Sequence, residues 1–284
     1  MKRRTFLKRV FGSILTLAGL SGGTYYYARD IEPTLLEINN QRIRSKKIPK
    51  AFHQFKIVQF TDTHLGFHYS IDQFTDLIQT INELSPDMIV FTGDLVDKPD
   101  RYNWNSHLIH ELKQLEAPYG KYWVYGNHDH GGYGTNILKD VMNQGGFTLL
   151  QNESREIKRD NEQFVLAGVD DIILGDPDLD KTLEQIDTNQ FTMLLAHEPD
   201  FADIAKQYPI DIQLSGHSHG GQIRFPFIGH LYTPVFAEKY IQGQYTFTSN
   251  NLHLFVSRGI GTTRLPYRFL CKPEIHLFTL ENDE

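Results

Sequence analysis

Cysteine, tryptophan and long apolar runs are all scarce in this sequence of 284 residues. The single cysteine, Cys271, excludes an internal disulfide framework and a zinc site built from several thiolates. The shortage of long apolar segments excludes a membrane protein with several spans. Hydrophobic residues make up 40% and charged residues 22%, which is typical of a globular chain. The length is sufficient for one large domain with a substantial core.

Positive charge is scarce beyond the first 29 residues. The chain has 28 Lys and Arg against 35 Asp and Glu, a formal net charge of −7. Six basic residues and no acid lie within residues 1–29, so the remainder has 22 basic against 35 acidic residues, a charge of −13. Such a surface repels nucleic acid, and we expect no nucleic-acid partner. Any phosphate must be bound at a local positive site.

The N-terminal segment is typical of a targeting signal. An arginine pair, Arg3-Arg4, stands in a basic run that precedes a short stretch of apolar and small residues. This pattern resembles the twin-arginine export signal, which makes the export machinery an expected partner. We expect the protein in the cell wall or on the outer face of the cytoplasmic membrane. The alternative is an N-terminal membrane anchor, because no clean cleavage site follows. Two segments are predicted: residues 1–29 as signal or anchor, and residues 30–284 as one domain.

Short apolar runs alternate with segments of helical periodicity from Phe55 onward, which predicts an α/β layered domain. Ser70 is a plausible N-cap for a helix over residues 71–84. Weaker helical patterns cover residues 108–115, 135–143, 179–186 and 201–207. The tail from about residue 240 is expected to form a second sheet. Strands are predicted at residues 55–60, 88–91, 122–125, 164–168, 191–195, 212–214, 252–256 and 275–280.

Five short polar motifs follow predicted strands, where the carboxyl ends of an α/β sheet form a ligand-binding crevice. Their side chains comprise two carboxylates, four imidazoles and one amide. Nitrogen and oxygen donors of this kind suit two divalent metal ions, with Mn expected and Fe or Zn as alternatives. Two such ions carry four positive charges; the two carboxylates and a bridging hydroxide remove three, so a net +1 would attract a phosphate diester. The predicted metal ligands are Asp62, His64, Asp94, Asn127, His197, His217 and His219.

His128 and Asp129 are predicted to be catalytic. A metal-bridging hydroxide would attack phosphorus in line, and His128 would protonate the leaving group as a general acid. Asp129, the next residue along the chain, is expected to orient the ring of His128.

The ordered motifs D-x-H, G-D, G-N-H-D, a lone His and G-H-x-H resemble the signature of the calcineurin-like metallophosphoesterases. This resemblance spans about Phe55 to the C-terminus and implies a four-layer α/β/β/α sandwich with a binuclear metal centre. It also implies the division of ligands and gives the catalytic histidine as His128. One ion would be bound by Asp62, His64, Asp94 and His219, and the other by Asp94, Asn127, His197 and His217.

The arginine-pair signal, the glycine-rich run at residues 131–134 and the tail at residues 257–269 resemble an exported bacterial branch of that family, the YkuE-like group. That branch is associated with the cell envelope. It is also similar to enzymes that cleave the pyrophosphate of UDP-linked diacylglucosamine. The sequence therefore predicts a phosphoesterase with a phosphate-ester substrate, with a phosphodiester favoured. A pyrophosphatase acting on a nucleotide-linked lipid and a non-catalytic, metal-stabilised envelope-binding protein are the alternatives.

Several charged residues outside the motifs have two possible roles. Arg258, Arg264 and Arg268 could contact phosphate or could be surface charges paired with acids. Asp170 and the aspartate after it follow an apolar strand, and a solvated loop is expected there. Cys271 is expected to be a buried thiol.

Overall fold

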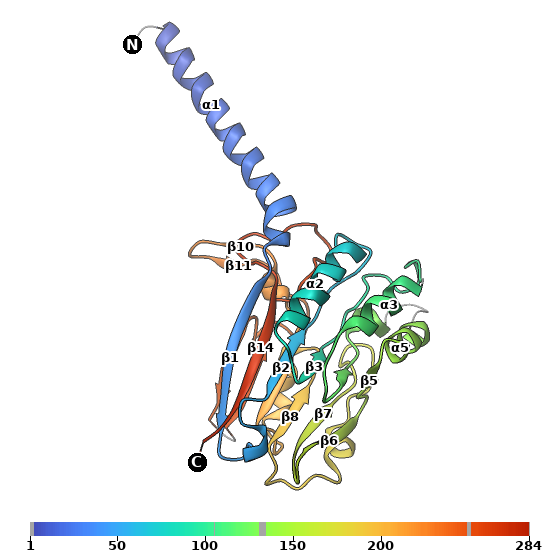
Figure 1. Cartoon of the computed structure of the whole chain (residues 1–284). Coiled ribbons are helices and arrows are strands. Elements are labelled where there is room, and N and C mark those ends of the chain that lie inside the picture. Colours follow the sequence, from blue (N-terminus) through green and yellow to red (C-terminus); the bar gives the residue numbers. More distant parts are fainter. Residues whose placement is uncertain (1–2, 105, 131–134, 249–250, 284) are drawn as a thin grey trace.

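The computed structural model describes residues 3–104, 106–130, 135–248 and 251–283. The glycine-rich run at 131–134, which contributes to the resemblance given above, lies outside them. Two six-stranded sheets form the domain (Figure 1). The first has the order β1 (Glu37–Ser45), β14 (Glu274–Asn282), β2 (Lys56–Phe60), β3 (Met88–Phe91), β4 (Lys121–Trp123) and β5 (Phe147–Leu149). The second has the order β12 (Gly243–Phe247), β13 (Leu252–Val256), β9 (Ile212–Ser215), β8 (Thr192–Leu195), β7 (Glu162–Gly168) and β6 (Glu153–Arg159).

Each sheet is built around four parallel strands. In the first sheet β2, β3, β4 and β5 are parallel, whereas β14 runs antiparallel to β2 and parallel to β1. In the second sheet β13, β9, β8 and β7 are parallel, and β12 and β6 are antiparallel edges. A short hairpin of β10 (Arg224–Phe225) and β11 (Gly229–His230) stands apart from both sheets.

The described residues form seven α-helices, most of which cover the outer faces of the sheets. They are α1 (Arg3–Tyr26), α2 (Ile71–Glu83), α3 (Ser106–Gln114), α4 (Asn127–His130), α5 (Thr135–Gln144), α6 (Leu179–Leu183) and α7 (Ala202–Ala205). A π-helix, η1 (Tyr27–Ile31), continues α1, and the 3₁₀ segments are η2 (Glu32–Thr34), η3 (Lys50–Phe52), η4 (Pro199–Phe201) and η5 (His219–Gly221). Ser70 caps α2 as predicted, because its side chain accepts from the amide of Gln73 while the Gln73 side chain accepts from the amide of Ser70.

The central strands alternate between two apolar layers, which is why the sheets can be covered on both faces. In β3, Met88 and Val90 join the cluster between the sheets, whereas Ile89 and Phe91 join the cluster under α2, α3 and α5. The second sheet divides in the same way between the shared layer and a third cluster with α6 and α7. The order of layers is therefore α/β/β/α, and the predicted fold class is confirmed.

The expectation that the whole tail forms a second sheet is wrong for its last strand. β12 and β13 belong to the second sheet, but β14 lies in the first, between β1 and β2 (Figure 1). Its apolar side chains Phe278 and Leu280 still face the layer between the sheets. An apolar run of this length fits either sheet, so the sequence alone does not select its neighbour.

The N-terminal helix α1 projects from the domain (Figure 1). The chain that follows it is hydrogen-bonded to the domain. The amide of Arg268 donates to the carbonyl oxygen of Ala28 at 2.8 Å. The buried carboxylate of Glu32 accepts hydrogen bonds from the amides of Leu270 (3.0 Å) and Cys271 (2.5 Å). Among the residues that the structure describes, no helix combines the length and apolar character needed to cross a membrane.

Candidate metal centre

The five polar motifs lie at the carboxyl ends of neighbouring parallel strands. In the first sheet they follow β2, β3 and β4, and in the second sheet they follow β8 and β9. Because the two sheets face each other, segments that are far apart in the sequence meet at one end of the layer between them. All seven predicted ligands lie in these loops: Asp62 and His64, Asp94, Asn127, His197, and His217 with His219.

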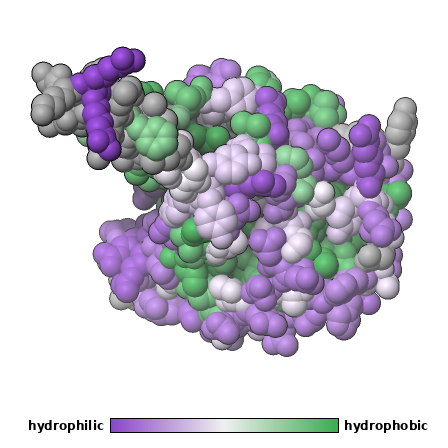
Figure 2. Space-filling model, turned by 90° about the horizontal axis from the view of Figure 1, so that it is seen from above, coloured by the Kyte–Doolittle hydropathy of each residue, from purple (hydrophilic) through white to green (hydrophobic). Residues whose placement is uncertain are grey.

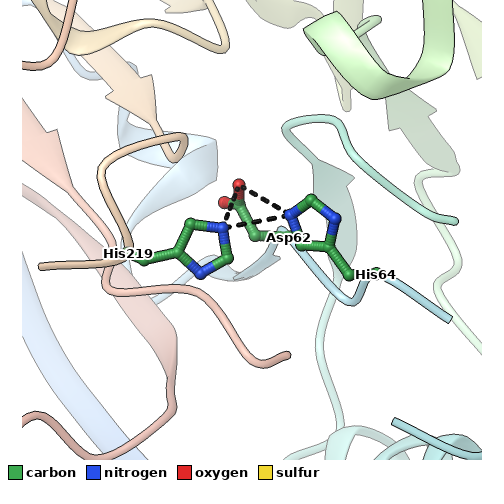
Figure 3. Close-up of side chains that lie close together, drawn as sticks. All are labelled: Asp62, His64 and His219. Carbon is green, nitrogen blue, oxygen red and sulfur yellow. Dashed lines mark hydrogen bonds and ion pairs between the residues drawn. The ribbon is translucent and has the colours of Figure 1, made fainter. Parts of the chain in front are cut away.

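One group of ligand atoms consists of Asp62, His64 and His219 (Figure 3). The Nε2 atoms of the two histidines are 3.0 Å apart. Asp62 Oδ1 lies 4.0 Å from His64 Nε2 and 3.5 Å from His219 Nε2. The three side chains are almost fully buried, so their nitrogen and oxygen atoms face one another rather than water.

A second group consists of Asp94, His197 and His217. Asp94 Oδ2 lies 3.3 Å from His197 Nε2, and that nitrogen is 3.2 Å from His217 Nδ1. Asp94 also connects the groups, because the same oxygen is 3.6 Å from Nε2 of His64. This arrangement suits a carboxylate that is shared between two cations.

The donor set fits two divalent cations. The carboxylate, imidazole and amide atoms are the ligands that Mn, Fe and Zn accept. The side-chain oxygen of Asn127 is buried and receives no hydrogen bond from the described part of the chain. A buried acceptor without a donor is costly, and a cation would satisfy it.

The backbone at this end of the sheets is held in a sparsely populated conformation. Asp62, His64, Asp94, His217 and His219 all have positive φ, between 45° and 64°. Non-glycine residues in this region cost roughly 1–3 kcal/mol each, and they cluster at functional sites. The ligands lie at strand ends as predicted, and this left-handed backbone is the reason that residues only two apart turn toward a common point.

Two motif glycines are required because a carboxylate of the site lies against the main chain at each of them. A Cβ atom at Gly126 would lie 2.3 Å from Asp94 Oδ1, and one at Gly216 would lie 2.3 Å from Asp62 Oδ2. Any larger residue would therefore displace a carboxylate of the site. The glycines in G-N-H-D and G-H-S-H thus allow the two carboxylates to approach the main chain.

Burial and neighbouring charges shift the ionisable groups in opposite directions. Burial opposes ionisation of Asp94, yet the imidazoles of His197 and His128 outweigh it and hold the pKa of Asp94 well below its usual range. Burial, with the charge of His197, lowers the pKa of His217 to about 3. Burial and the nearby His64 also lower the pKa of His219. For Asp94, His217 and His219 these shifts favour the protonation states that bind metal ions. The metal-free site shifts two other ligands the opposite way: Asp94 outweighs burial and raises the pKa of His197, and burial raises the pKa of Asp62.

The predicted pairing of His128 with Asp129 is wrong. Asp129 is fully buried, and its carboxylate accepts from the amides of Asp94 (2.7 Å), Leu95 (3.0 Å) and Gly126 (2.9 Å). Side chains adjacent in sequence on a helix do not face each other, and α4 carries both residues. Asp129 therefore fixes the loops that bear the ligands, and it does not orient the ring of His128.

Asp97, rather than Asp129, contacts the ring of His128 and orients it. Its carbonyl oxygen lies 2.7 Å from Nδ1 of His128, and its carboxylate is 3.5 Å from Nδ1 of His64. A carbonyl can only accept, so Nδ1 of His128 carries a proton. Burial lowers the pKa of His128, but Asp94 and Asp97 outweigh burial and raise it. The signal for Asp97 in the sequence was a second acid three residues after Asp94, in the same loop.

The additional arginines and Asp170 have structural contacts. Arg268 is buried and donates to the carbonyl oxygens of Gly261, Cys271 and Arg258, while Arg258 pairs with Glu37 and Glu274. Arg264 is exposed and lies over the ring of Tyr232, 4.7 Å from its centroid.

The solvated loop expected at Asp170 is not observed. This side chain is buried and accepts from His130 Nε2 at 2.7 Å and from Gln151 Nε2 at 3.0 Å. Burial opposes its ionisation, but these two partners outweigh burial and lower the pKa of Asp170 to about 2. The first residues after the strand, including Asp170, are buried, and the loop becomes exposed only from about residue 174. Cys271 is buried, as predicted.

The fold and this site define a metal-dependent phosphoesterase, and comparison with known proteins agrees. The model of the calcineurin-like phosphoesterase family matches residues 55–221, which include every predicted ligand. The chain therefore belongs to the calcineurin-like phosphoesterase family.

Three relatives show the extent of the similarity. The chain is 46% identical over 283 residues to the uncharacterized metallophosphoesterase YkuE of Bacillus subtilis (strain 168), covering 99% of this chain and 98% of that protein. It is 28% identical over 284 residues to the phosphodiesterase YaeI of Escherichia coli (strain K12), with 99% of each chain covered. A metallophosphoesterase of Aquifex aeolicus (strain VF5) is 31% identical over 263 residues, covering 88% of this chain and 94% of that one.

Proposed function

We propose that this protein is a binuclear metal-dependent phosphodiesterase that acts in the cell envelope. The observation that carries the proposal is the meeting of two ligand groups beside the partly exposed ring of His128, whose centroid is 4.6 Å from that of His64. Two divalent cations, with Mn²⁺ expected, would supply an acidified water as nucleophile and neutralise charge on the phosphate oxygens.

His128 is the general acid in this proposal. Its Nδ1 proton is held by the carbonyl of Asp97 at 2.7 Å, so Nε2 is the nitrogen that can donate to a substrate. The attacking water, which has given one proton to solvent, forms a bond to phosphorus as the bond from phosphorus to the leaving-group oxygen breaks. Nε2 of the cationic ring delivers its proton to that oxygen, which gives a phosphomonoester and an alcohol. General-acid catalysis of this kind contributes roughly 10²–10⁴-fold to the rate.

Charge favours a diester over a monoester. The carboxylate of Asp97 adds one negative charge to the count made from the sequence and the cationic ring of His128 adds one positive charge, so the count stays at +1. A phosphodiester carries one negative charge and a monoester close to two at neutral pH, so this count neutralises the diester but not the monoester.

The test compares substrates and metals on the full chain. The protein is stripped with a chelator, reloaded with Mn²⁺, and assayed on bis(p-nitrophenyl) phosphate, p-nitrophenyl phosphate and a UDP-linked lipid. We expect metal-dependent hydrolysis, fastest on the diester. Preference for the UDP-linked lipid would instead support a pyrophosphatase. Metal binding without turnover of any of the three would support a binding protein and contradict the proposal.

The role of His128 has its own test. His128→Gln should lose more activity on a diester with an alkyl leaving group than on one with p-nitrophenol, because only the poor leaving group needs a proton. His53→Gln is the matched control, since His53 is exposed and precedes β2 at the opposite end of that strand. Equal losses on both substrates would show that His128 acts only through the structure of the site.

Export is the remaining part of the proposal, and the basic N-terminal run supports it. The intact mass of protein recovered from the cell envelope of its host should lack N-terminal residues if the signal is cleaved. A full-length mass in the envelope would favour the anchor. Recovery of the full-length protein from the cytosol alone would contradict export in either form.

A further inference from the structure

A groove beside the metal centre presents a mostly apolar surface, which Gln222, Thr263 and Arg264 also border. It has a volume of about 480 Å³, and Ser218 and His219 form part of its lining. His219 also belongs to the ligand group with Asp62 and His64, so the groove borders the site. Its apolar walls are Ile223, Phe225, Leu231, Tyr232, Pro234 and Leu265.

These wall residues are unusually exposed. Leu231 is 67% exposed and Leu265 is 51% exposed, although the chain has a well-packed core elsewhere. They come from the β10–β11 hairpin, the segment after it and the loop at residues 263–265. Figure 2 looks down on the end of the molecule from which α1 leaves, and hydrophobic residues gather there among hydrophilic ones. A contiguous apolar surface of this kind marks a binding site.

A second cavity, of about 300 Å³, borders His128, the proposed general acid. It is lined by His128 and Asn127 together with Asp97, Lys98 and Asp100. Its lining residues are mainly charged or polar, whereas the walls of the groove are mainly aliphatic and aromatic. The general acid must contact the leaving group, so the leaving group lies on the His128 side. The groove next to His219 is then available to the substituent that stays on phosphorus.

We propose that the groove beside His219 binds a hydrocarbon chain on the non-leaving substituent, so that the preferred substrates are phosphodiesters carrying an alkyl or acyl chain. This inference rests on the proposed phosphodiesterase function. The shared residue His219 and the apolar walls both favour a chain attached to the bound phosphate. The net charge of −7 disfavours an anionic partner over the wider surface, whereas a hydrocarbon chain needs no charge complement.

The test uses a homologous series with one leaving group. Methyl, butyl and octyl p-nitrophenyl phosphates are compared on the Mn²⁺-loaded full chain, each below the concentration at which it forms micelles. Burying one methylene changes an equilibrium by about fourfold. We therefore expect kcat/KM to rise at least about tenfold from methyl to octyl. A flat series with the methyl compound hydrolysed would overturn the groove and leave the phosphodiesterase standing.

Two variants locate the effect. Leu231→Gln places a polar side chain in the groove wall and should lower the octyl-to-methyl ratio of kcat/KM about tenfold. Phe227→Ser is the control, because Phe227 is fully exposed at the tip of the same hairpin and does not line the groove. It should leave the ratio unchanged. An equal fall in both variants would indicate that the surface binds a lipid aggregate or another molecule rather than one chain, and would overturn the proposal.

Calorimetry tests binding of the hydrocarbon chain independently of hydrolysis. Octyl phosphate should bind the metal-loaded chain at least about tenfold more tightly than methyl phosphate, with a more negative heat-capacity change from apolar burial. Equal affinities would overturn the groove. If none of the diesters is hydrolysed but this difference in affinity is measured, the proposed function fails and the hydrocarbon site remains.

Discussion

The layer between the two sheets is apolar along most of its length and polar at one end. Around Phe164, the rings of Phe52, Phe55 and Phe191 lie at centroid distances of 4.9, 6.0 and 6.1 Å. At the carboxyl ends of the strands the same layer holds buried carboxylates and imidazoles on a left-handed backbone. The first region stabilises the fold by removing apolar surface from water, whereas the second costs free energy. The packed rings thus stabilise a scaffold on which an unfavourable cluster can be held.

The largest effect is expected in the apolar region. Phe164→Ala should lower the free energy of unfolding by about 3–5 kcal/mol, because it leaves a cavity among the packed rings. Urea denaturation measures it. Phe164→Leu is the control and should cost less, since it retains more of the volume. A loss under about 1 kcal/mol for the alanine variant would mean that this layer is not what stabilises the sheets.

The next effect concerns the polar end. Reloading the chelator-stripped protein with Mn²⁺ at about 100 times its dissociation constant should raise the free energy of unfolding by about 2.7 kcal/mol. His197→Ala removes a ligand and should reduce that increment, whereas His53→Ala, at an exposed position, should not. Thermal unfolding with and without metal measures both. An identical increment in the two variants would contradict the assignment of His197.

A smaller effect is expected where the polar end is anchored. Asp129→Asn turns an acceptor of three amide hydrogens into a group that also presents donors, which should cost about 1–3 kcal/mol of stability. The exposed Asp140→Asn is the control. If Asp129→Asn lowered activity while unfolding stayed unchanged, Asp129 would act on the chemistry and not on the loops.

The smallest effect concerns a buried charge away from the site. Nζ of Lys121, at the start of β4, donates to the carbonyls of Leu112 and Gly145, both at 2.7 Å. Burial lowers the pKa of Lys121 to about 8, below its unfolded value. The unfolded state then binds more protons above pH 8, so this residue's contribution to stability rises with pH from about 8 to 10.5.

Comparison with Lys121→Met isolates that contribution. The difference in unfolding free energy between wild type and variant should shift in favour of wild type by less than about 1 kcal/mol, because the two carbonyl acceptors favour the charged ammonium and offset much of the effect of burial. Urea denaturation at pH 7 and pH 10 measures it. A shift in the opposite direction would mean that the lysine remains charged in the folded protein.

The sequence predicted the central strands and the location of the ligands because both depend on local patterns. Asp62 and His197 each come just after a buried strand, and parallel strands necessarily bring such positions together. The edge strands β1 and β6 were not predicted. Their residues are polar and largely exposed, so they carry no apolar run. Pairing with a neighbour, rather than burial, makes them strands.

Contacts that depend on the path of the loops were beyond the sequence. Asp129 is next to His128 along the chain, yet the turn of α4 points the two side chains apart. Asp97 reaches His128 only because the loop after β3 lies beside the loop after β4. The apolar groove was also not predicted, since its wall residues come from a hairpin and a loop with no periodic pattern.

The anchoring of Glu32 sets a limit on how the N-terminus can be processed. Its carboxylate satisfies the amides of Leu270 and Cys271, and the thiol of Cys271 donates to the carbonyl oxygen of His219 at 3.2 Å. Peptide-bond cleavage beyond Glu32 would leave two amides without an acceptor one contact away from a ligand residue. If the N-terminal segment is cleaved, we therefore expect the cut before this glutamate, within or before α1 and η1, so that both amides keep their acceptor.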